Sequence, residues 1–347
     1  MKKITYLVNN ASSFVSHRLD LAIEAKKKKW NVTVLFGKSN GQNEQIAINK
    51  IKDIGVNYHQ IFFNKGGLNP LIEFFGLLHL IFLLNRIKPD ILHTVTPKGN
   101  LYGGIAARIL NIKSIIIAIS GKGYIFTDTN KSILRTVLSF VYDKIQKITF
   151  RHINIFFIVQ NRNDFNSLIN ENGISKEKII LIPGSGVNLK KFIPDKSITK
   201  NKLVILPARI LQDKGVLDFV EAAKIIKEFN NTIKMVLVGE IDSENPAHIA
   251  ESKISFWVKK NFIEWWKYKE NMVDIYQSAS IVCLPSYREG MPKALLEAAA
   301  CGCPIITTDV IGCREAIIPG LTGDLVQVRS PKALAQSILK LIDDKEK

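Results

Sequence analysis

The sequence predicts two α/β domains, each built on a parallel sheet. Its 347 residues are enough for two domains of ordinary size, and its apolar fraction of 46% is enough for packed cores. From residue 4 onward, short apolar runs alternate with amphipathic stretches, which is the pattern of βαβ units. The Gly- and Pro-containing stretch PGSGVNLKKFIPD marks a domain boundary near residue 185. We therefore expect domains at residues 1–185 and 186–347.

The first domain opens with one such βαβ unit. Ile4–Val8 is a short apolar strand, the loop from Asn9 to Ser16 is polar, and an amphipathic helix is expected from about His17 to Lys29. A second strand follows at Val32–Phe36. Loops at the carboxyl ends of parallel strands bind ligands, so the polar loop is a candidate binding segment. It lacks the GxGxxG pattern, and the turn gives no support for a dinucleotide cofactor.

A second candidate loop lies further along this domain. Further strands are expected at Asp90–Val95, Ile115–Ile119 and Ile155–Val159. The loop after the second of these contains Ser120, Gly121 and Lys122 and looks like a phosphate cradle. It is not a P-loop, because the GxxxxGK[ST] spacing is absent.

Residues 71–84, LIEFFGLLHLIFLL, form the most apolar stretch of the N-terminal half. The stretch is too short to span a bilayer and is interrupted by Glu73, Gly76 and His79. Two alternatives remain open. The helix is either fully buried in the core, or buried on one face and in contact with lipid or a lipid acceptor on another.

The net charge of +17 is unevenly distributed along the chain. Residues 1–175 contain 23 basic and 10 acidic side chains, a balance of +13, whereas residues 176–347 contain 25 and 21, a balance of +4. A half so basic attracts anionic lipid head groups or a lipid diphosphate. Plain solubility is one alternative. Nucleic-acid binding is another, but the sequence has no aromatic-basic RNA motif and no helix-turn-helix pattern.

Secretion and metal-binding signals are missing from the sequence. The apolar run of MKKITYLVNNASS is short and is interrupted by two asparagines, so we expect a cytoplasmic protein. The sequence contains no DxD pair that could bind a metal ion. We therefore expect metal-independent chemistry without a cofactor. Four cysteines match no zinc or redox spacing and are interpreted as small, reduced core residues: Cys283, Cys301, Cys303 and Cys313.

The segment 280–318 carries the strongest functional pattern. Ile281–Leu284 is predicted to be a buried strand, and a helix is expected from Pro292 to about Cys301, ended by Gly302. Its first turn would offer N–H groups and the positive end of the helix dipole to phosphate oxygens. The amides in question are those of Gly290, Met291 and Lys293. In the loop after the next strand, Gly312 permits a close backbone approach.

Two acids flank this predicted phosphate site. Glu289 precedes the helix, and Glu297 lies one turn inside it, about 7 to 8 Å along the axis from Pro292. One carboxylate could bind sugar hydroxyls and the other ribose hydroxyls, with a diphosphate between them. The alternative is that Glu289 is an ordinary acid at a helix N-terminus and that Glu297 is a solvent-exposed residue on the helix face. Because the helix is rich in Ala and Leu almost all round, it is expected to be buried, and a buried Glu297 needs a partner.

Two cations are expected to face the same phosphate. Arg209 and Lys214 flank one strand-to-helix loop, so an arginine fork and a lysine point charge can converge on a diphosphate and stabilise a leaving group. The alternative for Arg209 is a salt bridge with Asp213. Gly239 follows the next strand, at a position suited to a nucleotide base.

The segment 280–317 resembles the E-x7-E signature of glycosyltransferase family 4, retaining enzymes of the GT-B fold, and most closely its bacterial capsule and O-antigen branch. The resemblance covers nearly the whole chain, including VSHRLDLAIEA, KPDILHTVTPKGNLYGGIAAR, GSGVNLKKF and LPARILQDKGVLDFVEAA. It implies two facing Rossmann-like domains with parallel sheets, an acceptor on the first and a nucleotide sugar on the second. Arg209 and Lys214 match the family's Arg and Lys pair, and His17 and Arg18 resemble its HR pair at the acceptor cleft.

The resemblance also implies the substrates. The donor would be a UDP-sugar, with an N-acetylhexosamine as the favoured sugar, and the acceptor an undecaprenyl-diphosphate-linked glycan at the inner face of the bacterial plasma membrane. Gly186 would be a hinge or cleft residue. Two departures stand out. Many relatives have a histidine near Ser120, and most add a C-terminal helix that crosses back to the first domain, so domain closure would be weaker here.

Two rival functions remain at this stage. A GT-B nucleotide-sugar 2-epimerase would share the fold and the ligand but would need several carboxylates and a histidine in the cleft, and no lipid acceptor. A basic nucleic-acid-binding protein would show steeply salt-dependent binding to DNA or RNA and none to UDP.

Overall fold

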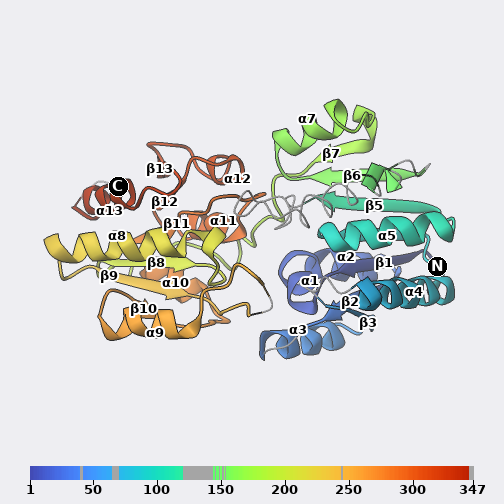
Figure 1. Cartoon of the computed structure of the whole chain (residues 1–347), viewed down its shortest axis with the longest axis horizontal. Helices are drawn as coiled ribbons and strands as arrows, with labels where there is room; N and C mark the ends of the chain where they lie inside the picture. Colours follow the sequence, from blue (N-terminus) through green and yellow to red (C-terminus); the bar gives the residue numbers. More distant parts are fainter. Residues whose placement is uncertain are drawn as a thin grey trace. The chain divides into compact units, whose positions relative to one another are not determined.

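The computed structural model describes residues 1–39, 42–64, 70–119, 154–243 and 245–343, and the single positions 144, 146, 147, 149, 150 and 152. The chain folds into two compact units, Met1–Pro183 (unit 1) and Gly184–Lys347 (unit 2). Both are α/β units (Figure 1). Across the described residues, no helix combines the length and the apolar character needed to cross a bilayer.

Unit 1 contains a seven-stranded parallel sheet in the order β3-β2-β1-β4-β5-β6-β7. Its strands are β1 Lys3–Val8, β2 Asn31–Lys38, β3 Asn57–Asn64, β4 Ile91–Val95, β5 Ser114–Ile119, β6 Ile155–Val159 and β7 Ile179–Leu181. Its described helices are α1 Ala11–His17, α2 Leu19–Lys27, α3 Gln42–Asp53, α4 Pro70–Ile87, α5 Pro97–Ile109, α7 Arg162–Asn170 and the short 3₁₀ turn η2 Lys176–Lys178.

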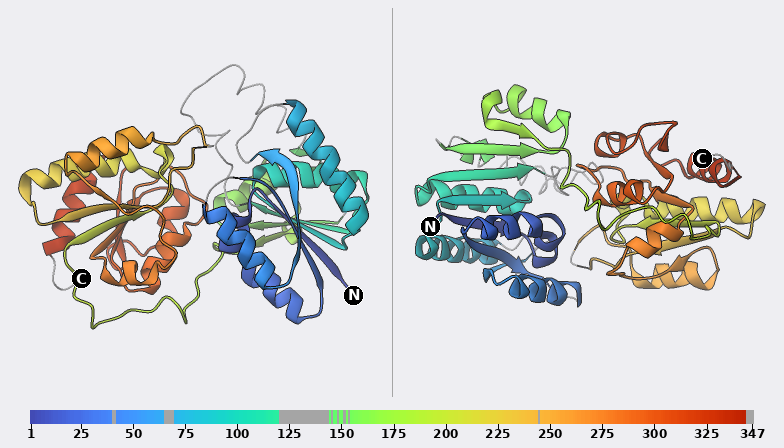
Figure 2. Two further views of the ribbon diagram at one scale, coloured as in Figure 1. Left: turned by 90° about the horizontal axis from the view of Figure 1, so that it is seen from below. Right: turned by 180° about the vertical axis from the view of Figure 1, so that it is seen from behind.

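Helices cover both faces of this sheet, which is why its central strands, such as β1 and β5, are rich in apolar residues. Tyr6 and Val8 of β1 point into one layer, where α1, α2 and α3 pack. Leu7, between them, points into the other layer, where α4, α5 and α7 pack. The layers can be followed in Figure 2.

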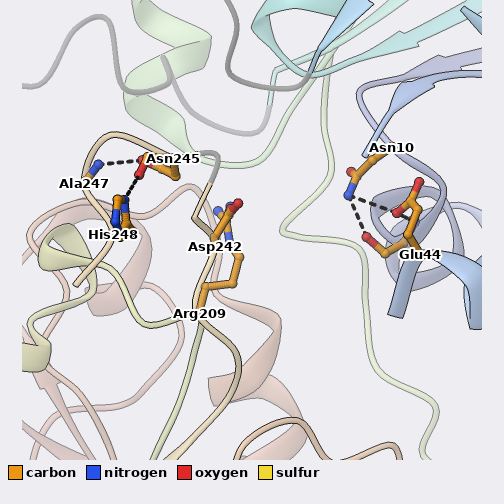
Figure 3. Close-up of polar contacts among 8 residues, drawn as sticks. Asn10, Glu44, Arg209, Asp242, Asn245, Ala247 and His248 are labelled. Atoms are coloured by element: carbon orange, nitrogen blue, oxygen red, sulfur yellow. Dashed lines mark hydrogen bonds and ion pairs between the residues drawn. The ribbon is translucent and has the colours of Figure 1, made fainter. Parts of the chain in front are cut away.

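The polar stretch after β1 is not the loop that the sequence predicts. α1 begins at Ala11, and the helix predicted from His17 to Lys29 is instead α2, separated from α1 by a break at Arg18. The cause is a tertiary contact. The buried carboxylate of Glu44, on α3, accepts hydrogen bonds from the amides of Ala11 at 2.6 Å and Ser12 at 3.1 Å, and so caps α1. The same carboxylate also accepts from the side-chain amide of Asn10 at 3.4 Å (Figure 3).

α4 settles the alternatives left open for residues 71–84. Leu80, Leu83 and Leu84 are buried against the core, whereas Phe75 and Phe82 on the opposite side are more than half exposed. A fully buried core helix is therefore the wrong interpretation of this stretch.

Unit 2 contains a six-stranded parallel sheet in the order β10-β9-β8-β11-β12-β13. Its strands are β8 Leu203–Pro207, β9 Lys234–Val238, β10 Glu264–Trp265, β11 Ile281–Leu284, β12 Ile305–Thr308 and β13 Gly323–Val326. Its helices are η3 Gln212–Lys214, α8 Val216–Phe229, α9 Glu251–Lys259, α10 Val273–Ser278, α11 Lys293–Ala300, α12 Ile311–Arg314 and α13 Pro331–Asp343.

The strand order reverses once in each sheet. In unit 1 the chain moves outward from β1 through β2 to β3 and then returns to β4 on the other side of β1. In unit 2 it moves from β8 through β9 to β10 and returns to β11 beside β8. The loops after the two central strands diverge at such a point, and open α/β sheets bind ligands there. The candidate site of unit 2 lies at the carboxyl ends of β8 and β11.

Candidate functional site

Two loops meet at the reversal point of unit 2. One follows β8 and leads through η3 into α8, and the other follows β11 and leads into α11. The amide of Tyr287 donates to the carbonyl of Asp213 at 2.9 Å. Gly215 has a φ of +71°, and a Cβ built on it would lie 2.0 Å from the carbonyl oxygen of Pro285. A glycine is therefore required where the loops touch.

An ion pair joins the same two loops. Lys214 Nζ lies 2.5 Å from Glu289 Oε1, which also accepts a hydrogen bond of 2.8 Å from the Ser286 hydroxyl. The Lys214 and Glu289 side chains are only 18% and 11% exposed. The main chain at Ser286 is fixed in turn, because Thr308 Oγ1 donates to its carbonyl. The structure thus brings together two of the predicted site residues and adds Ser286, which sequence reasoning missed.

The helix that follows begins one residue later than the sequence predicts. Pro292 is the N-cap of α11, with an extended backbone, and not its first helical residue. Its carbonyl accepts hydrogen bonds from the amides of Leu295 and Leu296. The helix ends at Ala300, followed by Cys301 as C-cap and Gly302 at a φ of +70°, as predicted for the stop signal. Gly290 and Met291, immediately before it, are buried.

Gly312, at the start of α12, supports this turn from the other side. A Cβ built on Gly312 would lie 2.3 Å from the carbonyl oxygen of Gly290. The predicted close backbone approach therefore exists, and its partner is the protein's own loop. The close packing of Gly312 holds Glu289 and Gly290 in place just before the N-terminus of α11.

Glu297 lies one turn inside α11 and is largely buried, as expected. Its carboxylate accepts a hydrogen bond of 3.3 Å from the hydroxyl of Tyr276, on α10, and lies 3.5 Å from Lys293 Nζ. Burial raises the pKa of Glu297, and the nearby Lys293 ammonium opposes that rise. Tyr276 had no signal in the sequence beyond the requirement that a buried acid has a partner.

The ion-pair partner of Arg209 is not Asp213, the alternative that the sequence offers. Its Nη1 lies 2.6 Å from Asp242 Oδ2, and the alternative pair with Asp213 is not formed (Figure 3). The Arg209 side chain is half exposed, so solvent or a ligand can reach it. Arg209 therefore lies on the same loop as Lys214, but in the structure its guanidinium is held by the loop after β9.

The loop after β9 is attached along the loop after β8. Ile210 donates its amide to Glu240, and Gln212 donates to Ala247, both at 2.9 Å. Asn245 closes the turn by accepting from the amide of Ala247 (Figure 3). Gly239 adopts a φ of +152°, and a Cβ there would lie 1.9 Å from the carbonyl oxygen of Ala208. This proximity excludes a side chain at the predicted base-binding position.

The remaining candidates lie outside this group. In unit 1, Arg18 is buried, and its Nη1 donates to the carbonyl of His17 at 2.9 Å. Burial of Arg18 lowers its own pKa. The pKa of His93 is lowered to about 3 by the burial of His93 and by the nearby Arg18 charge. Gly186, in unit 2, has a φ of +74°. Three candidates fall outside the described residues: Ser120, Gly121 and Lys122.

The four cysteines are small core residues. All four are free and buried, as predicted. Burial raises the pKa of Cys303 and of Cys313 to about 12, so both are neutral thiols at physiological pH. Within the described part of the chain, no group of three or more His, Cys, Asp or Glu side chains is arranged to hold a metal ion.

Comparison with known families decides the class of protein. Residues 189–347 match the family described as glycosyl transferases group 1, and residues 3–152 match the family described as glycosyl transferase 4-like. Together the two matches cover nearly the whole chain. The chain is a glycosyltransferase with a 4-like and a group 1 domain. The candidate site described above lies entirely within the group 1 match.

Three relatives of this glycosyltransferase are named for sugar transfer to diphospho-undecaprenol acceptors or for capsular polysaccharide synthesis. An N,N'-diacetylbacillosaminyl-diphospho-undecaprenol α-1,3-N-acetylgalactosaminyltransferase of Campylobacter jejuni is 28% identical over 99% of this chain and 90% of its own. The capsular polysaccharide biosynthesis glycosyltransferase CapM of Staphylococcus aureus is 29% identical over 78% and 71%. A UDP-Gal:α-D-GlcNAc-diphosphoundecaprenol α-1,3-galactosyltransferase of Escherichia coli is 28% identical over 78% and 70%.

Solved structures agree on the fold. Anabaena Alr3699/HepE in complex with UDP-glucose superposes with a TM-score of 0.75 and 16% identity, over all of this chain and 91% of its own. The sucrose-phosphate synthase of Thermosynechococcus elongatus gives a TM-score of 0.75 and 18% identity, over 99% and 90%. The predicted GT-B class, with two parallel-sheet α/β domains, is confirmed.

Proposed function

We propose that this glycosyltransferase moves a sugar, with an N-acetylhexosamine as the favoured one, from a UDP-sugar to an undecaprenyl-diphosphate-linked glycan, with retention at the anomeric carbon, as in family 4. The relatives from Campylobacter jejuni and Escherichia coli are named for acceptors of this kind, and the latter for a UDP-sugar donor. The product would be part of a capsule, an O-antigen or a related surface polysaccharide.

The observation that carries the proposal is the Lys214–Glu289 pair at the reversal point of the sheet. It sets a cation and an acid beside the first turn of α11, whose N-terminus favours phosphate. Glu297 lies eight positions further on, inside the helix. We assign the donor diphosphate to Lys214 and to the amides before α11, the donor sugar to Glu289, and the ribose to Glu297.

Arg209 completes the phosphate site once it leaves Asp242. A diphosphate offers the guanidinium a stronger bidentate partner than the single carboxylate contact seen here. Since the Arg209 side chain is half exposed, its rotation meets little packing resistance. We expect Arg209 and Lys214 together to neutralise the negative charge that grows on the departing diphosphate.

In the reaction itself, the bond between the anomeric carbon and the diphosphate oxygen breaks and a bond to the acceptor hydroxyl oxygen forms on the same face. The departing diphosphate oxygen takes the hydroxyl proton, so no separate base is required. His93 is unsuited to that role, because it is buried and its pKa is lowered to about 3.

The acceptor is assigned to unit 1, which carries most of the net positive charge. A lipid diphosphate is anionic and is anchored in the membrane, so a basic surface favours its approach. We expect the enzyme to work as a peripheral protein on the cytoplasmic face of the plasma membrane.

A panel of UDP- and GDP-sugars tests the donor assignment by thermal stabilisation, since a ligand that binds the folded state raises the melting temperature. The matching sugar should then be transferred to a diphosphate-linked acceptor with an α linkage, and chelator should leave the rate nearly unchanged. If none of the nucleotide sugars raises the melting temperature, the proposal is contradicted. Isomerisation of the donor in the absence of an acceptor would indicate a 2-epimerase.

A further inference from the structure

One face of α4 carries a row of large apolar side chains exposed to solvent. Leu71, Phe75, Leu78 and Phe82 follow the i, i+4, i+7, i+11 spacing of a single helical face, and Phe74 lies beside them. We call these five residues the apolar row. Their exposed fractions range from 46% to 69%. The row is about 16 Å long. Contiguous exposed apolar patches on soluble proteins often mark interaction sites.

The exposure does not come from a loosely attached helix. The opposite side of α4 is buried in the core of unit 1 through Leu80, Leu83 and Leu84. α4 packs against β3 and α5 and runs along the outside of the unit (Figure 2). The fold therefore holds the apolar row in a fixed outward position.

The charges of α4 are arranged to keep acid away from the row. Glu73 is the only acidic residue of the helix, and its carboxylate is 2.8 Å from Lys98 Nζ and 2.5 Å from the hydroxyl of Tyr102, both on α5. Its side chain is only 13% exposed. At the other end the row leads to Arg86, one turn after Phe82, with its guanidinium carbon 5.7 Å from the centre of the Phe82 ring. The exposed face is thus apolar along its length and basic at its end.

We propose that the apolar row of α4 inserts into the head-group region of an anionic phospholipid bilayer. Aromatic and leucine side chains on a surface-lying helix bury in that region, and an arginine at the end of the row reaches lipid phosphates. The charge of +13 over residues 1–175 attracts an anionic surface. The same charge opposes docking of a second copy of this chain on the row. The inference rests on the proposed function in one respect, namely that a lipid-linked acceptor gives the enzyme a reason to bind the membrane.

Flotation with lipid vesicles tests the inference on the full-length protein. Phosphatidylcholine vesicles are compared with vesicles of phosphatidylcholine and phosphatidylglycerol in equal parts. The wild-type protein should bind the mixed vesicles, and Phe75→Ser/Phe82→Ser should lower the vesicle partition coefficient by roughly tenfold or more. Arg86→Gln should lower binding to the mixed vesicles by about fivefold and leave binding to phosphatidylcholine unchanged.

Phe229→Ser is the matched control, because Phe229 of unit 2 is 74% exposed and lies outside the row. It should bind vesicles like the wild type. Equal binding by the double variant, or no binding by the wild type, would overturn the inference. A wild-type protein that is dimeric while the double variant is monomeric would also overturn the inference, since the row would then contact a second copy.

Donor binding separates the two proposals. Thermal stabilisation by UDP should be the same in the wild type and in Phe75→Ser/Phe82→Ser, because the row lies in unit 1 and the donor site in unit 2. Loss of vesicle binding with UDP binding intact supports the apolar row. Vesicle binding that depends on the row, in a protein that binds no nucleotide sugar, would support the row and contradict the proposed function.

Discussion

Lys214 and Glu289 are 75 positions apart in the sequence, and their charged groups are 2.5 Å apart in the fold. Each residue follows one of the two strands between which the strand order of unit 2 reverses, so the sheet topology creates the contact. The pair also shows that the acid and the cation share one small site. In the proposed complex, the donor diphosphate would compete with the Glu289 carboxylate for the Lys214 ammonium.

This competition predicts opposite effects on binding and on turnover. Glu289→Gln should bind UDP at least as tightly as the wild type, because it removes a negative charge beside the diphosphate, but its kcat should fall roughly 100-fold or more. Lys214→Ala should lose both UDP binding and transfer. Calorimetric titration with UDP and a sugar-transfer assay measure the two quantities. Lys224→Ala, at an exposed ion pair on α8, is the control and should match the wild type.

Glu297 predicts a pH dependence of stability. Its pKa is raised in the folded state by burial, so the protonated form is favoured on folding. The stabilising contribution of this group is therefore complete below its unfolded pKa and is lost as the pH rises through the higher folded value. Glu297→Gln cannot ionise, so its melting temperature relative to the wild type should increase from pH 4 to pH 7. A melting temperature of the variant that falls relative to the wild type from pH 4 to pH 7 would contradict the raised pKa. Transfer by Glu297→Gln should fall sharply at every pH, because ribose loses its carboxylate partner.

Gly215 predicts a steric cost where the two loops touch. Gly215→Ala places a Cβ on the carbonyl of Pro285 and also forces a left-handed φ on alanine. Gly173 has a similar φ of +65° with nothing within 4 Å of the added atom, so Gly173→Ala measures the backbone term alone. We expect about 1 kcal/mol of destabilisation for Gly173→Ala and about 3 kcal/mol or more for Gly215→Ala. Chemical denaturation gives both values, and equal losses would show that the loops can separate without cost.

Glu44 predicts a specific defect in unit 1. Glu44→Ala leaves the amides of Ala11 and Ser12 without their carboxylate and should destabilise the unit by about 3 kcal/mol. Glu24→Ala, at an exposed ion pair on α2, should cost less than about 0.5 kcal/mol. Hydrogen exchange at Ala11 and Ser12 should accelerate in the first variant only. Unchanged protection of these two amides would mean that α1 does not depend on this cap.

The sequence predicted local features better than pairings. Gly302 was correctly placed at the end of α11, since a helix stop depends on a few adjacent residues. Glu297 was correctly expected to need a partner, but Tyr276 could not be named. The partner of Arg209 that proximity in the sequence offers is Asp213, four positions away, whereas its partner in the structure is Asp242 on another loop. Such a choice depends on which strands are neighbours, and apolar periodicity does not contain that information.

The sequence by itself determined the two α/β units, most of their apolar strands, and the end of α11 at Gly302. These follow from short-range periodicity and from residue chemistry. Only the tertiary structure decided that Glu44 caps α1, that Glu289 joins Lys214, and that the row from Leu71 to Phe82 faces solvent. Each of these depends on which segments the order of the strands and the packing of the helices bring together, and contacts between segments far apart in the chain leave no periodic trace in the sequence.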